Sequence, residues 1–254
     1  MGITEALDRN LWITRVALDE YDVRGALLLA GNRDAIVWDT LSRPRDMAAY
    51  HPLIADRRLT IVYSHADWDH IWGTAGLPYE DADIVAHALT RDRFSSDVPD
   101  VLAEKRAAHP GDWDDVVLVA PTEAFGANRT LEVHGTTLEL HHLPGHTPDC
   151  IVGFIPDRGL LLAGDTIETP CPVVPADSPL NAWIGELRRW AADLRVSTVI
   201  PAHGPIGGRD LLDRNIEYLE AILAGHPHVP HGPLSAFYRE THLQNLRWTG
   251  PAGG

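Results

Sequence analysis

Lysine is almost absent from this chain. Lys105 is the single lysine among 21 basic residues, so an anionic group on a substrate has to be met by arginine, by a metal ion or by backbone amides. Acidic residues number 36, and the formal net charge is -15. This excess of negative charge argues against a function in which the chain binds nucleic acids by neutralising their phosphates. We therefore expect a small-molecule substrate and no nucleic-acid partner.

Cysteines and long apolar runs are scarce as well. Two cysteines, Cys150 and Cys171, cannot form a disulfide framework. No stretch approaches the roughly 18 apolar residues needed to span a bilayer, and the opening "MGITEALDRNLW" has no positive segment followed by an apolar run. These absences predict a soluble, cytoplasmic protein with no membrane partner.

The remaining composition is that of an ordinary globular domain. With 254 residues, 44% of them hydrophobic, the chain can bury a full core. Short apolar runs alternate with helical patterns, and no repeat, low-complexity block or long linker interrupts them. We expect one domain over residues 1–254.

Two kinds of periodic pattern indicate an α/β domain with two sheets. Short apolar and β-branched runs predict strands at 24–31, 34–40, 58–64, 83–88, 136–143, 150–156, 159–165 and 196–204. Apolar residues at helical spacing predict amphipathic helices at 179–194 and 207–225. The polar region 95–115 has no clear pattern.

Four segments place a candidate metal ligand just after a predicted strand. They are "HADWDH", "PGHTPD", "AGDT" and "PAHGP". Any one of these residues alone is an ordinary loop or turn residue. Together, histidines and carboxylates that follow strands can converge on one sheet edge as a mixed nitrogen and oxygen shell for a divalent metal. The candidates are His65, Asp67, Asp69, His70, His146, Asp165 and His203.

The order of these motifs resembles the metallo-β-lactamase superfamily. That family has H-x-H-x-D-H, then a histidine in a G-H-T-like turn, an aspartate at a G-D strand end and a histidine in a G-H-G-like turn. Asp39 matches the family's early aspartate, and the resemblance covers roughly residues 20 to 220. It implies a four-layer αβ/βα sandwich, in which two mixed β-sheets are flanked by helices and metals lie between the sheet edges. The ligand sets it implies are His65, Asp67 and His146 for the first metal and Asp69, His70 and His203 for the second, with Asp165 bridging.

Asp67 is the departure from the family pattern, because the family most often has its second histidine there. A carboxylate adds negative charge and an oxygen ligand, which shifts preference toward harder ions. Two divalent ions are expected, with zinc favoured and iron or manganese as alternatives. Asp67 could instead bind through water, or merely accept a hydrogen bond near the ligands.

The ligand set predicts a metal-dependent hydrolase. Two divalent cations that share a water make a hydroxide nucleophile, here for a small ester, thioester, lactone or amide. Asp69 would hold the second metal and orient the hydroxide, which makes it the candidate catalytic residue. Two alternatives stay open. One is a di-iron oxidoreductase, because flavo-diiron proteins of this superfamily carry a glutamate at the place of Asp67; the other is a non-catalytic metal-binding or ligand-sensing protein.

Several other residues are weaker candidates. Cys171 could approach the metals from a loop, although a buried, inert thiol is the simpler reading. His141 and His142 are neighbours on a predicted strand, so at most one of them can face the site. The tract "HPHVPH", with His226, His228 and His231, is typical of an extended loop. Four aromatic residues are candidate pocket walls, namely Tyr50, Trp68, Trp72 and Trp248.

Overall fold

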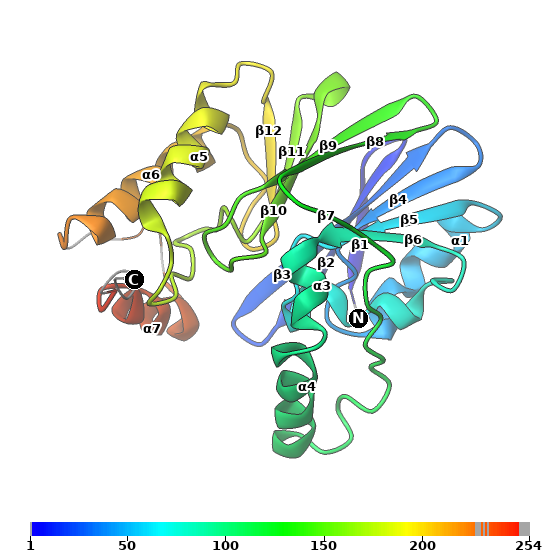
Figure 1. Ribbon diagram of the computed structural model, residues 1–254, viewed down its shortest axis with the longest axis horizontal. Helices are drawn as coiled ribbons and strands as arrows, with labels where there is room; N and C mark the ends of the chain where they lie inside the picture. Colours follow the sequence, from blue (N-terminus) through cyan, green and yellow to red (C-terminus); the bar gives the residue numbers. More distant parts are fainter. Residues whose placement is uncertain (1, 227–229, 231, 233, 249–254) are drawn as a thin grey trace.

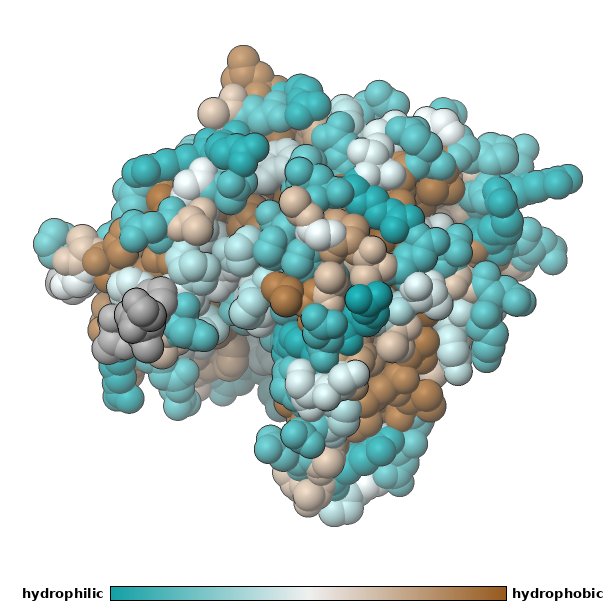
Figure 2. Space-filling model, in the orientation of Figure 1, coloured by the Kyte–Doolittle hydropathy of each residue, from teal (hydrophilic) through white to brown (hydrophobic). Residues whose placement is uncertain are grey.

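The computed structural model describes residues 2–226, 230, 232 and 234–248 (Figure 1). Two β-sheets form the centre of the molecule, and helices lie on their outer sides. The visible face is largely hydrophilic, with hydrophobic residues gathered beside α4 (Asp97–Ala108) (Figure 2). Among the described residues, no helix is both long enough and apolar enough to cross a membrane.

The first sheet has seven strands in the order β1-β2-β3-β4-β5-β6-β7. The first four strands pair antiparallel, and β4 to β7 pair parallel. The carboxyl ends of β4 and β5 therefore lie at the same edge, which brings the residues that follow them together. The bounds are β1 Ile3–Asp8, β2 Leu11–Leu18, β3 Tyr21–Ala30, β4 Asp34–Trp38, β5 Arg58–Val62, β6 Asp83–His87 and β7 Glu123–Phe125.

The second sheet has five strands in the order β12-β11-β10-β9-β8. Only β11 and β12 pair parallel, and β10 runs antiparallel to both of its neighbours. As a result β9, β11 and β12 all end at one edge of this sheet. The bounds are β8 Asn128–Val133, β9 Thr136–His142, β10 Ile151–Ile155, β11 Leu160–Gly164 and β12 Thr198–Pro201.

Helices cover the outer face of each sheet. Beside the first sheet are α1 His51–Ile54, α2 Trp68–Ile71, α3 Ala88–Arg93 and α4, with short 3-10 turns η1 Pro44–Tyr50 and η2 Thr74–Gly76. Beside the second sheet are α5 Leu180–Ala192, α6 Asp210–Leu223 and α7 Ala236–Asn245. A third 3-10 turn, η3 Pro156–Arg158, links β10 to β11.

Alternating side chains of the strands build three buried layers. In β4, Ile36 packs between the two sheets, whereas Val37 packs under the helices of the first sheet. In β10, Ile151 faces the first sheet and Phe154 faces α5 and α6. This alternation is the period of two that a strand buried on both faces requires. The four-layer αβ/βα sandwich with two mixed sheets is thereby confirmed.

Every predicted element is present, and the structure adds strands and helices that the sequence patterns do not indicate. All eight predicted strands and both predicted helices appear, with bounds shifted by a few residues. The sequence patterns do not indicate β1, β2, β7, β8 or α7, and region 95–115, where α4 forms, carries no clear pattern. Helix α4 buries only Val98 and Leu102, so its sequence carries little helical periodicity. The single domain over 1–254 stays a prediction.

Candidate metal centre

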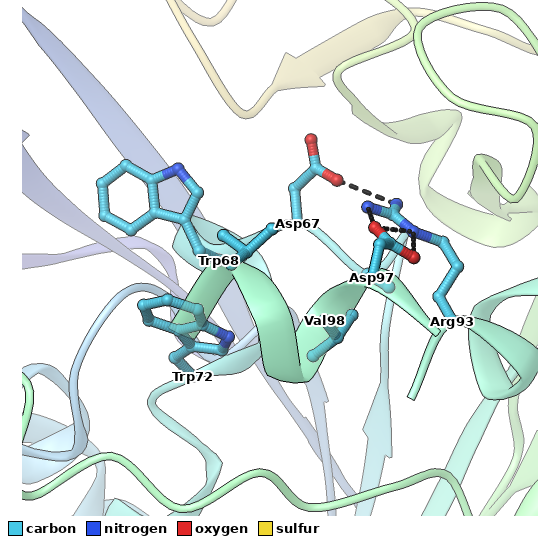
Figure 3. Close-up of a pocket in the computed structure, with 8 residues that line it drawn as sticks. Asp67, Trp68, Trp72, Arg93, Asp97 and Val98 are labelled. Atoms are coloured by element: carbon cyan, nitrogen blue, oxygen red, sulfur yellow. Dashed lines mark hydrogen bonds and ion pairs between the residues drawn. The ribbon is translucent and has the colours of Figure 1, made fainter. Parts of the chain in front are cut away.

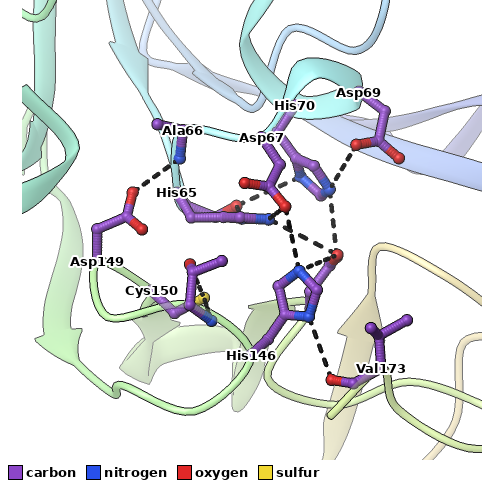
Figure 4. Close-up of polar contacts among 12 residues, drawn as sticks. His65, Ala66, Asp67, Asp69, His70, His146, Asp149, Cys150 and Val173 are labelled. Atoms are coloured by element: carbon purple, nitrogen blue, oxygen red, sulfur yellow. Dashed lines mark hydrogen bonds and ion pairs between the residues drawn. The ribbon is translucent and has the colours of Figure 1, made fainter. Parts of the chain in front are cut away.

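All seven predicted ligands meet where the edges of the two sheets face each other. Figure 4 labels His65, Asp67, Asp69, His70 and His146 among them. From the first sheet, β5 leads into His65, and the turn and α2 that follow supply Asp67, Asp69 and His70. From the second sheet, the chain beyond β9, β11 and β12 supplies three more. These are His146, Asp165 and His203.

The ligand atoms gather in two groups with Asp165 between them. Within each of the sets His65, Asp67, His146 and Asp69, His70, His203, the ligand atoms lie within 4.8 Å of one another. Asp165 Oδ2 is 3.6 Å from His65 Nε2 and 3.5 Å from His146 Nε2. Its Oδ1 is 3.2 Å from both His70 Nε2 and His203 Nε2. One carboxylate therefore turns one oxygen toward each group.

Every histidine of the cluster is oriented through its Nδ1. Three rings donate from Nδ1 to an oxygen, and the Nδ1 of His65 is hydrogen-bonded to the hydroxyl of Ser64 at 3.0 Å. Fixing Nδ1 in this way aims Nε2 at the cluster, as in metal-ligating histidines generally. The three acceptors are Asp39 Oδ2 for His70 at 2.9 Å, the Val173 carbonyl for His146 at 3.3 Å and the Asp22 carbonyl for His203 at 2.6 Å.

Buried atoms at the centre make no hydrogen bond. They are the Nε2 atoms of His65 and His70 and Oδ1 of Asp165. Leaving buried polar atoms without a partner costs free energy, and such atoms call for an explanation such as an ion. Imidazole nitrogens and carboxylate oxygens in this arrangement are the donors that borderline divalent cations take. The residues therefore fit metal ions.

Opposite charges hold the cluster together electrostatically. Burial alone would raise the pKa of Asp165, but His203, His70 and His65 hold it well below its ordinary value. Burial likewise opposes protonation of His146 and His203, yet the neighbouring carboxylates raise their pKa values to about 9 and about 10. A protonated imidazole cannot bind a metal through the same nitrogen. Metal binding would therefore release protons from His146 and His203.

One carboxylate oxygen of Asp67 faces an arginine (Figure 3), and the other faces the cluster (Figure 4). Its Oδ2 is 3.2 Å from His146 Nε2, whereas its Oδ1 is 2.8 Å from Arg93 Nη1. Arg93, the last residue of α3, also binds Asp97 at 2.7 Å and the fully buried Asp149 at 3.0 Å. Asp149 in turn accepts from the backbone N–H of Ala66 at 2.8 Å, next to the ligands. Arg93 therefore leaves only Oδ2 of Asp67 turned toward the cluster.

Sequence reasoning missed Arg93 and Glu168. Glu168 is buried and accepts from the Tyr238 hydroxyl at 2.7 Å and from the Val173 backbone N–H at 3.2 Å, so it fixes the loop that holds His146. No motif marks either residue. Asp39, which the family pattern did indicate, accepts from both the backbone N–H and the hydroxyl of Ser64 at 2.7 Å.

The weaker sequence candidates stay outside the cluster. His142 stacks on His87 with ring centroids 3.8 Å apart, and His141 packs against Trp190. Cys171 is a buried free thiol, and burial raises its pKa to about 12, which disfavours the thiolate that would bind a metal. Of the "HPHVPH" tract, His228 and His231 lie outside the described residues. Among the aromatic candidates, Tyr50 and Trp72 are core residues, Trp248 packs beside the second-sheet helices and Trp68 is half-buried near the cluster.

Comparison with known proteins gives one family and one fold. The family model described as Metallo-beta-lactamase superfamily matches residues 25–203. The solved metallo-beta-lactamase from Pontibacter korlensis superposes with a TM-score of 0.67 at 17% identity, covering 87% of this chain and 99% of that one. The metallo beta lactamase from Erythrobacter litoralis gives a TM-score of 0.64 at 20% identity, covering 86% and 96%. DIM-1 metallo-beta-lactamase gives 0.63 at 20% identity, covering 87% and 97%.

A curated relative matches over a shorter stretch. The linear primary-alkylsulfatase of Pseudomonas sp. (strain ATCC 19151) is 24% identical over 115 residues, which are 42% of this chain. The match spans 21% of the length of that relative.

Proposed function

Because the chain belongs to the metallo-β-lactamase superfamily of hydrolases, we propose that it cleaves a small ester, thioester, lactone or amide at the cluster described above. The observation that carries this proposal is the placement of Asp165. Its two oxygens face two separate ligand groups, which is the arrangement that a pair of metal ions needs. Hydrolysis then requires no nucleophilic side chain.

The proposed cofactor is a pair of divalent ions, with zinc favoured. His65, Asp67 and His146 would hold the first ion, Asp69, His70 and His203 the second, and Asp165 both. When bound, such ions supply Lewis acidity to a substrate oxygen and lower the pKa of water toward neutrality. The four imidazoles suit zinc, whereas three carboxylates leave iron or manganese as competitors.

Asp69 is the proposed catalytic residue. Its Oδ1 lies 3.8 Å from His70 Nε2, and its Oδ2 lies 3.7 Å from His203 Nε2. Each oxygen of Asp69 thus lies near one histidine of the second group, where it can accept a hydrogen bond from the attacking water and so orient it. Asp39 supports the same group by fixing the ring of His70.

A sulfate ester is a second candidate substrate. The observation in its favour is the local similarity to a linear primary-alkylsulfatase. A sulfate ester offers anionic oxygens to a cation, and its cleavage by water needs the same two elements, an oriented water and a polarised oxygen.

Metal analysis together with a substrate panel tests the proposal. Protein purified without added metal should contain two ions per chain, and metal-loaded enzyme should turn over at least one member of a panel of lactones, aryl esters, thioesters, amides, sulfate esters, phosphodiesters and RNA. Asp69→Ala should lower kcat by about 100-fold or more. The exposed Asp177, changed to alanine, is the matched control and should keep full activity.

Three outcomes would contradict the proposal. One ion or none would refute the metal pair. RNA or phosphodiester turnover well above all other substrates, abolished in Asp69→Ala, would refute the substrate class. Iron with redox activity and no hydrolysis would favour the oxidoreductase.

A further inference from the structure

The side chain of Asp67 turns away from the helix that Asp67 precedes. Asp67 is the N-cap of α2, a position where aspartate commonly accepts a hydrogen bond from the backbone of the first helical turn, yet its carboxylate makes no such bond. Instead, Oδ1 lies 2.8 Å from Arg93 Nη1 (Figure 3). Oδ2 lies 3.2 Å from His146 Nε2 and 3.6 Å from His65 Nε2 (Figure 4). The arginine on one side and the cluster on the other therefore set the orientation of Asp67.

The guanidinium of Arg93 is itself held in one orientation. Its Nε and Nη2 both donate to Oδ2 of Asp97, at 3.0 Å and 2.7 Å. Its Nη1 reaches Asp67 Oδ1 at 2.8 Å and Asp149 Oδ1 at 3.0 Å. Arginine stays protonated in proteins, and its donors form a planar, rigid fork. A fork that two other carboxylates fix in this way holds Oδ1 of Asp67 in one place.

Asp149 ties this arginine to the segment that carries the ligands. Asp149 is fully buried, and its Oδ2 accepts from the backbone N–H of Ala66 at 2.8 Å and from the hydroxyl of Thr90 at 3.0 Å. Ala66 directly precedes Asp67, and Thr90 belongs to α3, the helix that ends at Arg93. Arg93 and the backbone that carries Asp67 are therefore fixed to the same carboxylate.

The contact with Arg93 limits the number of ligand atoms that the first group offers. With Oδ1 held by the arginine, the group presents one atom from each of four residues, namely His65 Nε2, Asp67 Oδ2, His146 Nε2 and Asp165 Oδ2. With Oδ1 released, Asp67 could offer both oxygens to an ion, as carboxylates do with hard cations. A four-atom set with two imidazoles is typical of zinc, whereas additional oxygens suit manganese.

We propose that Arg93 is a positioning residue that sets the metal selectivity of the first group. By holding Oδ1, Arg93 makes Asp67 a ligand with one atom, as is the histidine that the family pattern most often has there. Its positive charge also offsets part of the negative charge that the aspartate adds. Arg93 thereby favours zinc at a site whose aspartate, taken alone, favours a harder ion. The inference rests on the metal pair of the proposed function, but its test measures metal binding and not turnover.

Competition with a chelator tests the inference by measuring the dissociation constants of zinc and of manganese. The constants that Asp67→Ala removes belong to the first group. Arg93→Met should lower the preference of this group for zinc over manganese by about tenfold, because groups that orient a metal ligand change metal affinity by this order. Arg93→Lys keeps a cation beside Oδ1 and should retain most of the preference. The control Arg189→Met removes an exposed arginine of α5 and should leave both constants unchanged.

The Asp67→His background separates selectivity from a purely structural role of Arg93. The imidazole of a histidine offers one nitrogen to the cluster whether or not the arginine is present. Adding Arg93→Met to Asp67→His should therefore leave the preference of that background unchanged. Arg93→Met also leaves the buried Asp149 without its cation, so the pair variant Arg93→Met Asp149→Asn repeats the measurement without the unpaired charge. It should show the same loss of preference as Arg93→Met.

Three results would overturn the inference. The first is that Arg93→Met and the pair variant weaken zinc and manganese equally, or shift the preference toward zinc. The second is an equal shift of the preference with and without Asp67→His. The third is a wild-type first group that binds no ion, which refutes the proposed metal pair as well. Unchanged selectivity in the variants refutes this inference alone, and absence of turnover of any substrate refutes the proposed hydrolysis and leaves the binding result intact.

Discussion

Asp67 is the side chain that distinguishes this centre most clearly from the family pattern. If it is a direct ligand, Asp67→His should retain metal at the first group and raise the preference for zinc over manganese, because imidazole removes a negative charge and suits a softer ion. Asp67→Ala should reduce the content toward one ion per chain. Elemental analysis after dialysis against equal zinc and manganese measures both effects.

The same experiment separates the two interpretations of Asp67. Should both variants keep wild-type content and preference, Asp67 only accepts a hydrogen bond from His146, and the ligand assignment is wrong. Asp177→Ala serves as the control for the loss of one exposed carboxylate.

The seven clustered residues could be predicted because each follows a strand and because their order matches a known family. Arg93 could not, since it ends a short helix and meets Asp67 and Asp149 only through the tertiary fold. The same holds for Glu168, which meets Val173 and Tyr238 only in the folded chain. Motifs record residues that follow strands, whereas partners contributed by helices depend on packing.

Arg93 links helix α3 to the loop that carries Asp149 and to the beginning of α4. Replacing it with methionine leaves the fully buried Asp149 without its cation, and the unpaired buried charge is destabilising. We expect the free energy of unfolding to fall by about 2–3 kcal/mol. This is less than for a fully buried ion pair, because the Arg93 side chain is 21% exposed and water can reach the pair. Denaturant unfolding measures this loss.

Arg189→Met is the matched control for that substitution. Its side chain is 76% exposed and pairs with Glu186 on the surface of α5, so the change should cost no more than about 0.5 kcal/mol. Equal effects of the two variants would show that the Arg93 network adds nothing beyond an ordinary surface ion pair.

Strands that are buried on both faces are easier to predict from the sequence than strands that are exposed. Strands β10 and β11 are buried at every position and give the apolar runs that identify them. Strand β1 is almost wholly exposed and gives no such run, although it pairs with β2 along its length. Strand β2 places Leu11 and Ile13 in the core, so part of its alternation is visible in the sequence even though no strand is predicted there.

The centre joins the two halves of the sandwich, since each ligand group takes side chains from both sheets. His65 and Asp67 of one group follow β5, whereas His146 follows β9 of the other sheet. An ion held by such a group binds the folded chain and not the unfolded one. At a free concentration 100 times its Kd, it stabilises the fold by about 2.7 kcal/mol.

Chelation should therefore lower Tm by roughly 5–10 °C in a chain of this size, measured by calorimetry before and after treatment with a chelator. Readdition of zinc should restore Tm. Asp165→Asn changes the residue that faces both groups, so its Tm should respond much less to the chelator. A wild-type Tm that stays constant while elemental analysis records complete loss of metal would show that the sandwich closes without the ions and that the cluster contributes no link between the sheets.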